Sequence, residues 1–356
     1  MDFGLSSERA TIVEWARGLA SRTGGLELVR GLRSGVDAAS EAYRELGAAG
    51  LLGLGIDSGD HLDRALACEQ LGAQLVWTPQ LDSAVCIGEL LALAGGRALL
   101  DDVLDGSAIV AAPLAQLAAP VELPAMSVEP VAEIVVRSPW LPVATHVAVA
   151  VWLPPDVREG DLAVIFLPRA AWTAQHVGAY VDFLPVHETR ISVQHLLDHG
   201  IVRDGPQVGE ALDLAVSRTL TALAAFTAGA GRAALELAAE YARHRVQFGR
   251  PIGAFQAQQQ KLADALLRVR QAEQLVRAAA VRSEPDAQRF ASAAASRLAL
   301  RSFRQAAQTA SFVHGGYGLS LEFDVHLYFV YAQILAGCYG DTAVRRLGEA
   351  SQREAA

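Results

Sequence analysis

The stretch YARHRVQFGRPIGAFQ (Tyr241–Gln256) interrupts two long helical patterns and concentrates positive charge in a chain that is acidic overall. Before it, apolar residues recur at helical spacing over about residues 209–247, and a second helical pattern starts near Ala254. Pro251 and its flanking glycines continue a helix only at a cost, so the stretch predicts a sharp reversal between antiparallel helices. Three arginines and a histidine there indicate a site for an anion; the alternative is a solvated helix end favoured by the helix dipole.

Along the rest of the chain the sequence pattern changes twice, from helical to β-rich and back to helical. Residues 7–104 have helical periodicity, with Ser7 as the expected N-cap, and a third long helix is expected over Pro285–Val313. Between them, prolines separate the short β-rich runs AEIVVR, HVAVAVWL, LAVIFL and RISVQHL, which predict a small β-sandwich or barrel. We therefore predict an N-terminal α-helical domain in residues 1–105, a middle β-domain in 106–206 and a C-terminal antiparallel helical bundle in 207–356.

Composition narrows the classes of partner. The 356 residues are 52% hydrophobic with a net charge of −9, which favours an oligomer and disfavours nucleic-acid binding, because such binding needs a basic surface. Prolines interrupt the apolar run Ala108–Met126, so we expect no membrane span, and MDFGLSSERA shows no secretory signal. The expected location is the cytoplasm. Three scattered cysteines (Cys68, Cys86 and Cys338) predict neither a disulfide framework nor a zinc site.

The hairpin pattern R-x-x-F-G-R-P-I-x-x-F-Q, followed later by HGGYG, resembles the acyl-CoA dehydrogenase family. RELGAAGLLGLGI also resembles the first helix and turn of that family, and the resemblance runs nearly end to end. It implies the acyl-CoA dehydrogenase fold, in which helical, β and helical parts follow one another.

The resemblance implies FAD as cofactor, because the family's hairpin reaches across a subunit interface to the pyrophosphate and adenosine of a neighbour's FAD. Carried over position by position, the cofactor-binding residues are Arg245, Gln247, Phe248, Gln256, His314, Gly315 and Gly316. Guanidinium groups and open glycine backbone suit phosphate oxygens. HGGYG can also be a helix C-cap and tight turn, and Gln256 an ordinary first-turn residue; the two roles of the glycines are compatible.

The catalytic base of the family is missing. The family reaction removes two hydrogens from an acyl-CoA thioester: a Glu takes the α proton and flavin N5 takes the β hydrogen as hydride. At the usual Glu position this chain has Tyr339, or Ala336 if a gap is allowed. At the second position known in relatives it has Ser217 or Thr219. None of these four residues is a base at neutral pH, so no catalytic residue is expected.

Other cofactor contacts are also lost. The family's T-E-P-x-x-G-S-D segment is replaced by IVAAPLAQLAAPVEL, and its W-[IV]-T segment by Trp140-Leu141-Pro142, where we expect Trp140 to be a core residue. Phe312 stands where a Gln commonly precedes HGG. Contacts to the flavin ring within one subunit are therefore degraded, while contacts to a neighbour's cofactor are kept.

This asymmetry resembles the small, silent subunits of heteromeric actinobacterial acyl-CoA dehydrogenases, which act on substrates such as steroid side-chain CoA thioesters. It implies a catalytic acyl-CoA dehydrogenase partner in an α2β2 complex, with acyl-CoA bound in that complex. One alternative is a self-sufficient flavoenzyme with a relocated base, either Asp341 or the more distant Asp213 and Glu210; Asp341 is otherwise expected to cap a helix. The other is a structural paralogue without FAD.

Two further acidic features receive ordinary explanations. Glu322 is expected to face solvent or to pair with an arginine. The acidic cluster Asp57, Asp60, His61 and Asp63 imitates a metal site, but helix caps and turns explain it better, and no metal is expected.

Overall fold

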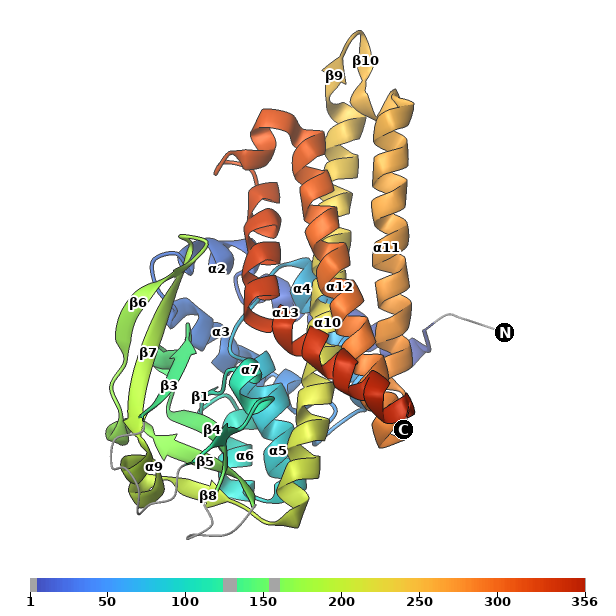
Figure 1. Ribbon diagram of the computed structural model, residues 1–356. Helices are drawn as coiled ribbons and strands as arrows, with labels where there is room; N and C mark the ends of the chain where they lie inside the picture. Colours follow the sequence, from blue (N-terminus) through green and yellow to red (C-terminus); the bar gives the residue numbers. More distant parts are fainter. Residues whose placement is uncertain (1–4, 124–132, 154–160, 356) are drawn as a thin grey trace. The chain divides into compact units, whose positions relative to one another are not determined.

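The computed structural model describes residues 5–123, 133–153 and 161–355 (Figure 1). The chain forms two compact units. The first comprises Met1–Arg30, Asp60–Trp77 and Leu220–Ala356, and the second comprises Gly31–Gly59 and Thr78–Thr219. The three domain ranges given above remain a prediction.

Long helices dominate the first unit, as the helical periods predict. They are α10 (Pro206–His244, whose first turns belong to the second unit), α11 (Gln256–Ala280), α12 (Pro285–His314) and α13 (Val325–Ala355). The shorter helices are α1 (Ser7–Arg22), α2 (Gly25–Gly31) and α4 (His61–Ala73). Helix α12 packs against both α11 and α13. The expected N-cap at Ser7 is wrong by one residue, because the Ser6 side chain accepts the hydrogen bond from the Arg9 N–H.

Glycines allow α4 and α10 to cross closely. A Cβ at Gly72 would lie 1.9 Å from the carbonyl oxygen of Phe226, and one at Gly229 would lie 2.0 Å from the carbonyl oxygen of Glu69. Real Cβ atoms do not approach this closely, so each helix depends on the glycine of the other.

A buried ion cluster lies beside this crossing. Arg232 bridges Glu69 and Glu273 at 3.3 and 3.5 Å, and Arg270 pairs with Glu273 at 2.7 Å. Burial, followed by the repulsion from Glu273, raises the pKa of Glu69.

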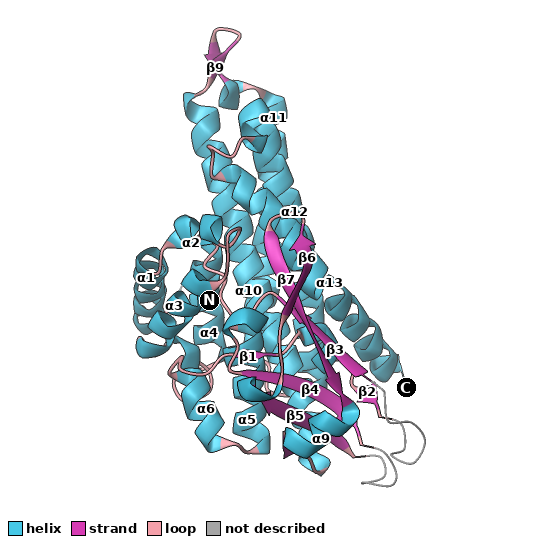
Figure 2. Cartoon of the chain, turned by 90° about the vertical axis from the view of Figure 1, so that its left-hand side faces the viewer, coloured by secondary structure: helices cyan, strands magenta, loops and turns pink. Residues whose placement is uncertain are grey.

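The second unit contains two sheets (Figure 2). In the larger, β1 (Val110–Ala111), β4 (His146–Trp152), β5 (Leu162–Pro168) and β8 (Ile201–Arg203) lie in that order, and β2 (Val121–Glu122) also pairs with β4. The smaller has the order β3 (Glu133–Ser138), β7 (Leu184–Ser192) and β6 (Gln175–Tyr180). Five consecutive residues are buried in each of β4 and β5, so these strands form the centre of the core.

Short helices complete the second unit. They are α3 (Asp37–Ala48), a π-helical segment (Leu81–Ile87), α5 (Gly88–Ala94), α6 (Arg97–Leu104), α7 (Leu114–Leu117) and α9 (Val193–His199). The strand predicted for RISVQHL is half wrong, because Ser192 caps α9 through the His195 N–H and the chain turns helical there.

Two further observations concern the described residues. Within them, only α10 is long and apolar enough to cross a membrane by length and composition, and its apolar window is mostly buried. The end of the run Ala108–Met126 lies outside the described part of the chain. In the same described part no group of three or more His, Cys, Asp or Glu residues could hold a metal ion, and Asp60 and Asp63 form the capping box of α4, as expected.

Candidate functional site

The predicted reversal is a β-hairpin that projects from the end of the bundle between α10 and α11 (Figure 1). Its strands β9 (Val246–Gln247) and β10 (Arg250–Pro251) are joined by Phe248 and Gly249, which have φ of 52° and 78°. Positive φ at both loop residues is the geometry of a tight hairpin turn, which Asn-Gly normally satisfies. Phe248 is 91% exposed in this strained position.

Two of the hairpin's arginines have no carboxylate partner among the described residues. Arg243 and His244 both bind Glu240 at 2.7 Å, and the hydrogen bond from Arg243, followed by that from His244, lowers the pKa of Glu240. The guanidinium carbons of Arg245 and Arg250 instead lie 5.9 and 4.2 Å from the ring centroids of Tyr317 and Phe255. Their charge therefore remains available to an external anion.

The HGGYG turn lies in the same unit as the hairpin. Helix α12 ends at His314, Gly315 is its C-cap with φ of 63°, and the 3-10 turn η6 (Gly315–Leu319) follows, so the expectation of a helix cap and turn is confirmed. His314 is buried, its ring stacks on Tyr241 at a centroid distance of 4.3 Å, and its Nδ1–H donates a hydrogen bond to the Ala310 carbonyl oxygen at 2.8 Å. A Cβ at Gly315 or Gly316 would meet nothing within 4 Å, so the backbone there is open to a ligand.

Arg245 lies beside this turn, because its guanidinium group is stacked over the ring of Tyr317. Gln247 is exposed and pairs with Arg250 across the hairpin. Gln256 is the exposed first residue of α11, which agrees with the alternative expectation that it is an ordinary first-turn residue.

Sequence reasoning did not single out Tyr241 and Tyr317, although they stand inside YARHR and HGGYG. For Tyr241 the neighbouring Arg243 and Arg245 were an available signal; for Tyr317 the sequence places no arginine nearby.

At the two positions where the family resemblance expects a base, this chain has no carboxylate. Tyr339 is 3% exposed within α13, and Ala336 is half-buried one turn earlier. Asp341 does not cap a helix, contrary to expectation, because α13 runs through it. It is exposed, whereas Tyr339 is buried; residues two apart on a helix point to opposite sides, so Asp341 cannot reach the space that Tyr339 occupies.

The second location is occupied by hydroxyl groups bonded to their own helix. The Ser217 hydroxyl donates to the Asp213 carbonyl at 2.9 Å, and the Thr219 hydroxyl donates to the Ala215 carbonyl at 2.7 Å. Of the nearby acids, Glu210 is exposed and Asp213 half-buried.

The segments that replace the family's flavin-ring contacts belong to the second unit. IVAAPLAQLAAPVEL forms β1, α7 and β2. Trp140 is fully buried, as expected of a core residue, and Pro142 is exposed. Phe312, at the usual Gln position, is 68% exposed and cannot replace an amide's hydrogen bonds.

The hairpin and turn offer groups that could hold one end of a dinucleotide. Arg245 and Arg250 could pair with phosphate oxygens, the open Gly315 and Gly316 backbone could approach them, and Phe248 could contact the nucleoside. These residues offer binding groups only.

Known proteins share both sequence and fold with this chain. The acyl-CoA dehydrogenase C-terminal domain model matches residues 210–350. Acyl-CoA dehydrogenase IpdE2 of Mycobacterium tuberculosis is 32% identical over 279 residues, covering 74% of this chain and 78% of that protein. A chain of the ChsE4-ChsE5 complex of M. tuberculosis has a TM-score of 0.78 at 24% identity, with 98% of each chain covered.

The structure described as the Tcur3481-Tcur3483 steroid ACAD G363A variant has a TM-score of 0.77 at 22% identity, again with 98% of each chain covered. Other solved neighbours of the fold contain FAD or FADH2. The predicted fold class is thereby confirmed. Since the identity to IpdE2 extends over more than two thirds of both proteins, this chain belongs to the acyl-CoA dehydrogenase family.

Proposed function

We propose that this chain is a non-catalytic subunit of a cytoplasmic, flavin-dependent acyl-CoA dehydrogenase, and that it completes the FAD site of a catalytic partner in an α2β2 complex. Bound FAD supplies the acceptor for the hydride from the β carbon of the acyl-CoA. In this chain Arg245, Gln247, Phe248, Gln256 and the His314–Gly316 turn hold the pyrophosphate and adenosine end. The partner supplies the carboxylate that takes the α proton.

One observation carries the proposal: unpartnered charge and strain are kept at the hairpin, while each expected base position lacks an acid. Arg245 and Arg250 face no carboxylate among the described residues, and Phe248 keeps a positive φ at full exposure. Tyr339, by contrast, is packed inside a continuous helix.

The substrate is proposed to be a bulky acyl-CoA, with steroid side-chain CoA thioesters as the first to test. A solved neighbour is described as a steroid ACAD, and a member of the ChsE4-ChsE5 complex shares the fold. These likenesses support a partner subunit and a substrate class as proposals for this chain.

Co-expression with a neighbouring acyl-CoA dehydrogenase gene tests the proposal. We expect the purified complex to contain flavin and to dehydrogenate acyl-CoA, and the isolated chain to have no turnover. Arg245→Ala should lower flavin per complex, because it removes the guanidinium beside Tyr317. Tyr339→Phe should leave turnover unchanged, and Arg243→Ala is the matched control, since Glu240 already neutralises Arg243.

Three results decide between the readings. Turnover by the isolated chain supports a self-sufficient enzyme and contradicts the proposal. A complex without flavin supports a structural paralogue. Equal flavin loss in Arg243→Ala and Arg245→Ala would indicate a nonspecific effect of net charge, not a phosphate contact at Arg245.

A further inference from the structure

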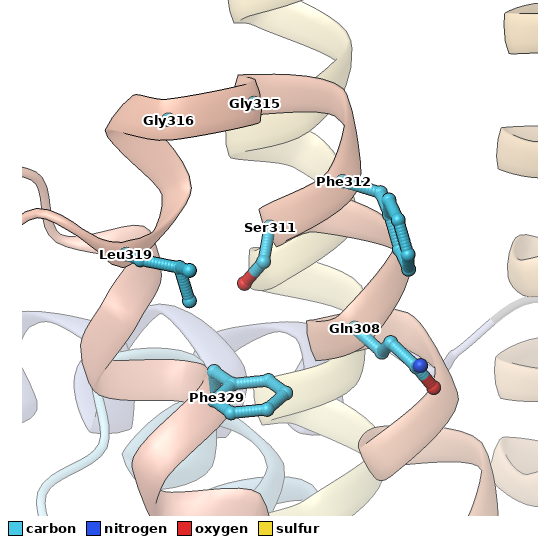
Figure 3. Close-up of a pocket in the computed structure, with 7 residues that line it drawn as sticks. All are labelled: Gln308, Ser311, Phe312, Gly315, Gly316, Leu319 and Phe329. Carbon is cyan, nitrogen blue, oxygen red and sulfur yellow. The ribbon is translucent and has the colours of Figure 1, made fainter.

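Two histidines that the proposed function does not use face each other on strands β6 and β7 of the smaller sheet (Figure 2). His176 and His187 stand directly opposite in the antiparallel pairing, so their side chains leave the sheet on the same face. Both belong to the second unit. The cavity of about 420 Å³ beside the HGGYG turn belongs to the first unit, and Gly315 and Gly316 line it, so it is part of the proposed dinucleotide site (Figure 3).

The rings of His176 and His187 are arranged so that both could bind one metal ion. Their centres are 5.5 Å apart, and their planes are inclined by 71°. A ring nitrogen binds a transition metal at about 2.0–2.1 Å along a lone pair in the ring plane, so two rings that share an ion have centres at most about 6 Å apart. Planes with this inclination cross beside the rings, and an ion on the line where they cross lies in both planes.

Both rings also have a nitrogen that an ion can reach. His176 is exposed, and neither ring makes a hydrogen bond to another described residue. In the half-buried His187, Nδ1 is buried without a partner among the described residues, whereas Nε2 is not, so Nε2 is the accessible nitrogen. Burial, followed by the repulsion from His176, lowers the pKa of His187, so its ring keeps the lone pair that a metal needs to a lower pH than usual.

The sheet holds the two histidines in place before any ion binds. Strand β7 is central in the order β3-β7-β6, and His187 pairs with Ser138 of β3 on its other side. The register of β6 shifts between His176 and Gly178, directly after the pair. A β-bulge of this kind bends an edge strand and sets the direction of the neighbouring side chains. Because the backbone is already fixed, little ordering of the chain would oppose binding.

A second pair of histidines, His195 and His199 on α9, has a different geometry. Their rings are stacked, with centres 4.3 Å apart and planes inclined by 27°. Hydrogen bonds hold them there, because the His195 Nε2–H donates to the Ala171 carbonyl oxygen at 2.7 Å and the His199 Nδ1–H donates to the His195 carbonyl oxygen at 3.3 Å. The in-plane lone pairs of nearly parallel rings do not meet at one ion, so this pair is a matched comparison.

We propose that His176 and His187 together bind one transition-metal ion of the class that imidazole ligands prefer, such as Ni²⁺, Cu²⁺ or Zn²⁺. Two protein ligands leave positions on the ion for water or for an external ligand. This binding requires neither FAD nor a partner subunit, so it stands apart from the proposed function.

Isothermal titration calorimetry of the chain, purified without a histidine tag, tests the proposal with Ni²⁺ as the probe. We expect one Ni²⁺ per chain and no comparable binding of Mg²⁺, which prefers oxygen ligands. His176→Gln and His187→Gln should each weaken Ni²⁺ binding by about 10-fold or more, because one ring alone loses the advantage of two linked ligands. The double variant should be little weaker than either single variant, since the two rings act as one unit.

The control variant is His199→Gln, which makes the same change at an exposed histidine of the comparison pair and should keep the wild-type affinity. Thermal unfolding tests folding and location together. Without metal, His176→Gln should unfold at the wild-type temperature, because His176 is exposed. Ni²⁺ should raise the unfolding temperature of the wild-type chain and of His199→Gln, but not that of His176→Gln.

The proposal is overturned if the wild-type chain binds no Ni²⁺, or if His176→Gln or His187→Gln keeps the wild-type affinity. An equal loss of affinity in His199→Gln also overturns it, because the ion would then lie at α9. Binding of Mg²⁺ as tight as that of Ni²⁺ would contradict it as well, since carboxylates and not imidazoles would then hold the ion.

Discussion

Phe248→Asn should raise the stability of the chain and lower the flavin content of the complex. Phe248 has φ of 52° in a two-residue hairpin loop, a conformation that Asn adopts more readily by roughly 1 kcal/mol. Its side chain is 91% exposed, and its described aromatic contact is edge-on to Phe255 at a centroid distance of 6.2 Å. Losing that exposed contact gives up about 0.5 kcal/mol, at the low end for aromatic pairs.

The free energy of unfolding should therefore rise by about 0.5 kcal/mol, measured by urea denaturation of the isolated chain. Flavin per complex, measured by absorbance after co-expression with the partner, should fall, because the nucleoside loses its aromatic contact. Val181→Asn is the matched control: Val181 is also exposed, with φ of 53°, in the turn between β6 and β7. It should stabilise the chain and leave flavin unchanged. A destabilised Phe248→Asn chain, or full flavin content in its complex, would refute the reasoning.

Gly72→Ala should lower the free energy of unfolding by about 3 kcal/mol or more, because the new Cβ would collide with the α10 backbone. Gly337→Ala is the control: Gly337 lies in open space on α13, so the change should be neutral or stabilising by up to about 1 kcal/mol. Thermal unfolding of the two variants measures the difference. The raised pKa of Glu69 means that the folded state holds its proton more strongly than the unfolded chain, so the free energy of unfolding should fall as pH rises from the ordinary value of 4.5 through the raised pKa. Urea denaturation across this range should show a flatter dependence for Glu69→Gln. Asp341→Asn should leave turnover of the complex unchanged, because Asp341 faces away from Tyr339; a large loss would favour the self-sufficient enzyme.

Sequence patterns predicted the long helices well because their signals are local and repeated. The reversal followed from Pro251 and its flanking glycines, and α12 begins at the predicted Pro285. The end of α10 was misplaced by three residues, at Gln247 instead of His244, because Val246 pairs across the hairpin with Pro251. Pairing between strands is a contact that helical periodicity does not contain.

Features that depend on tertiary contacts were missed. Strand β6 is largely exposed on both faces, so it lacks the alternation that marks a strand, and its pairing with β7 alone defines it. Helix α13 continues through Gly337 and Gly340, where a turn was expected before TAVRRL, since helices tolerate glycine at moderate cost.

Tyr339 and the hairpin between α10 and α11 have opposite effects on the stability of this chain. A carboxylate in place of Tyr339 would have to be buried inside α13, and a buried charge is unfavourable unless it is paired. The tyrosine avoids that cost, because it places no carboxylate there. The hairpin instead keeps Phe248 at a positive φ, which is unfavourable for the isolated chain, and keeps Arg245 and Arg250 without a carboxylate partner among the described residues. Keeping unpaired positive charge where an anion could bind, and an uncharged residue where a base would stand, is the pattern expected of a subunit that serves the cofactor of its neighbour.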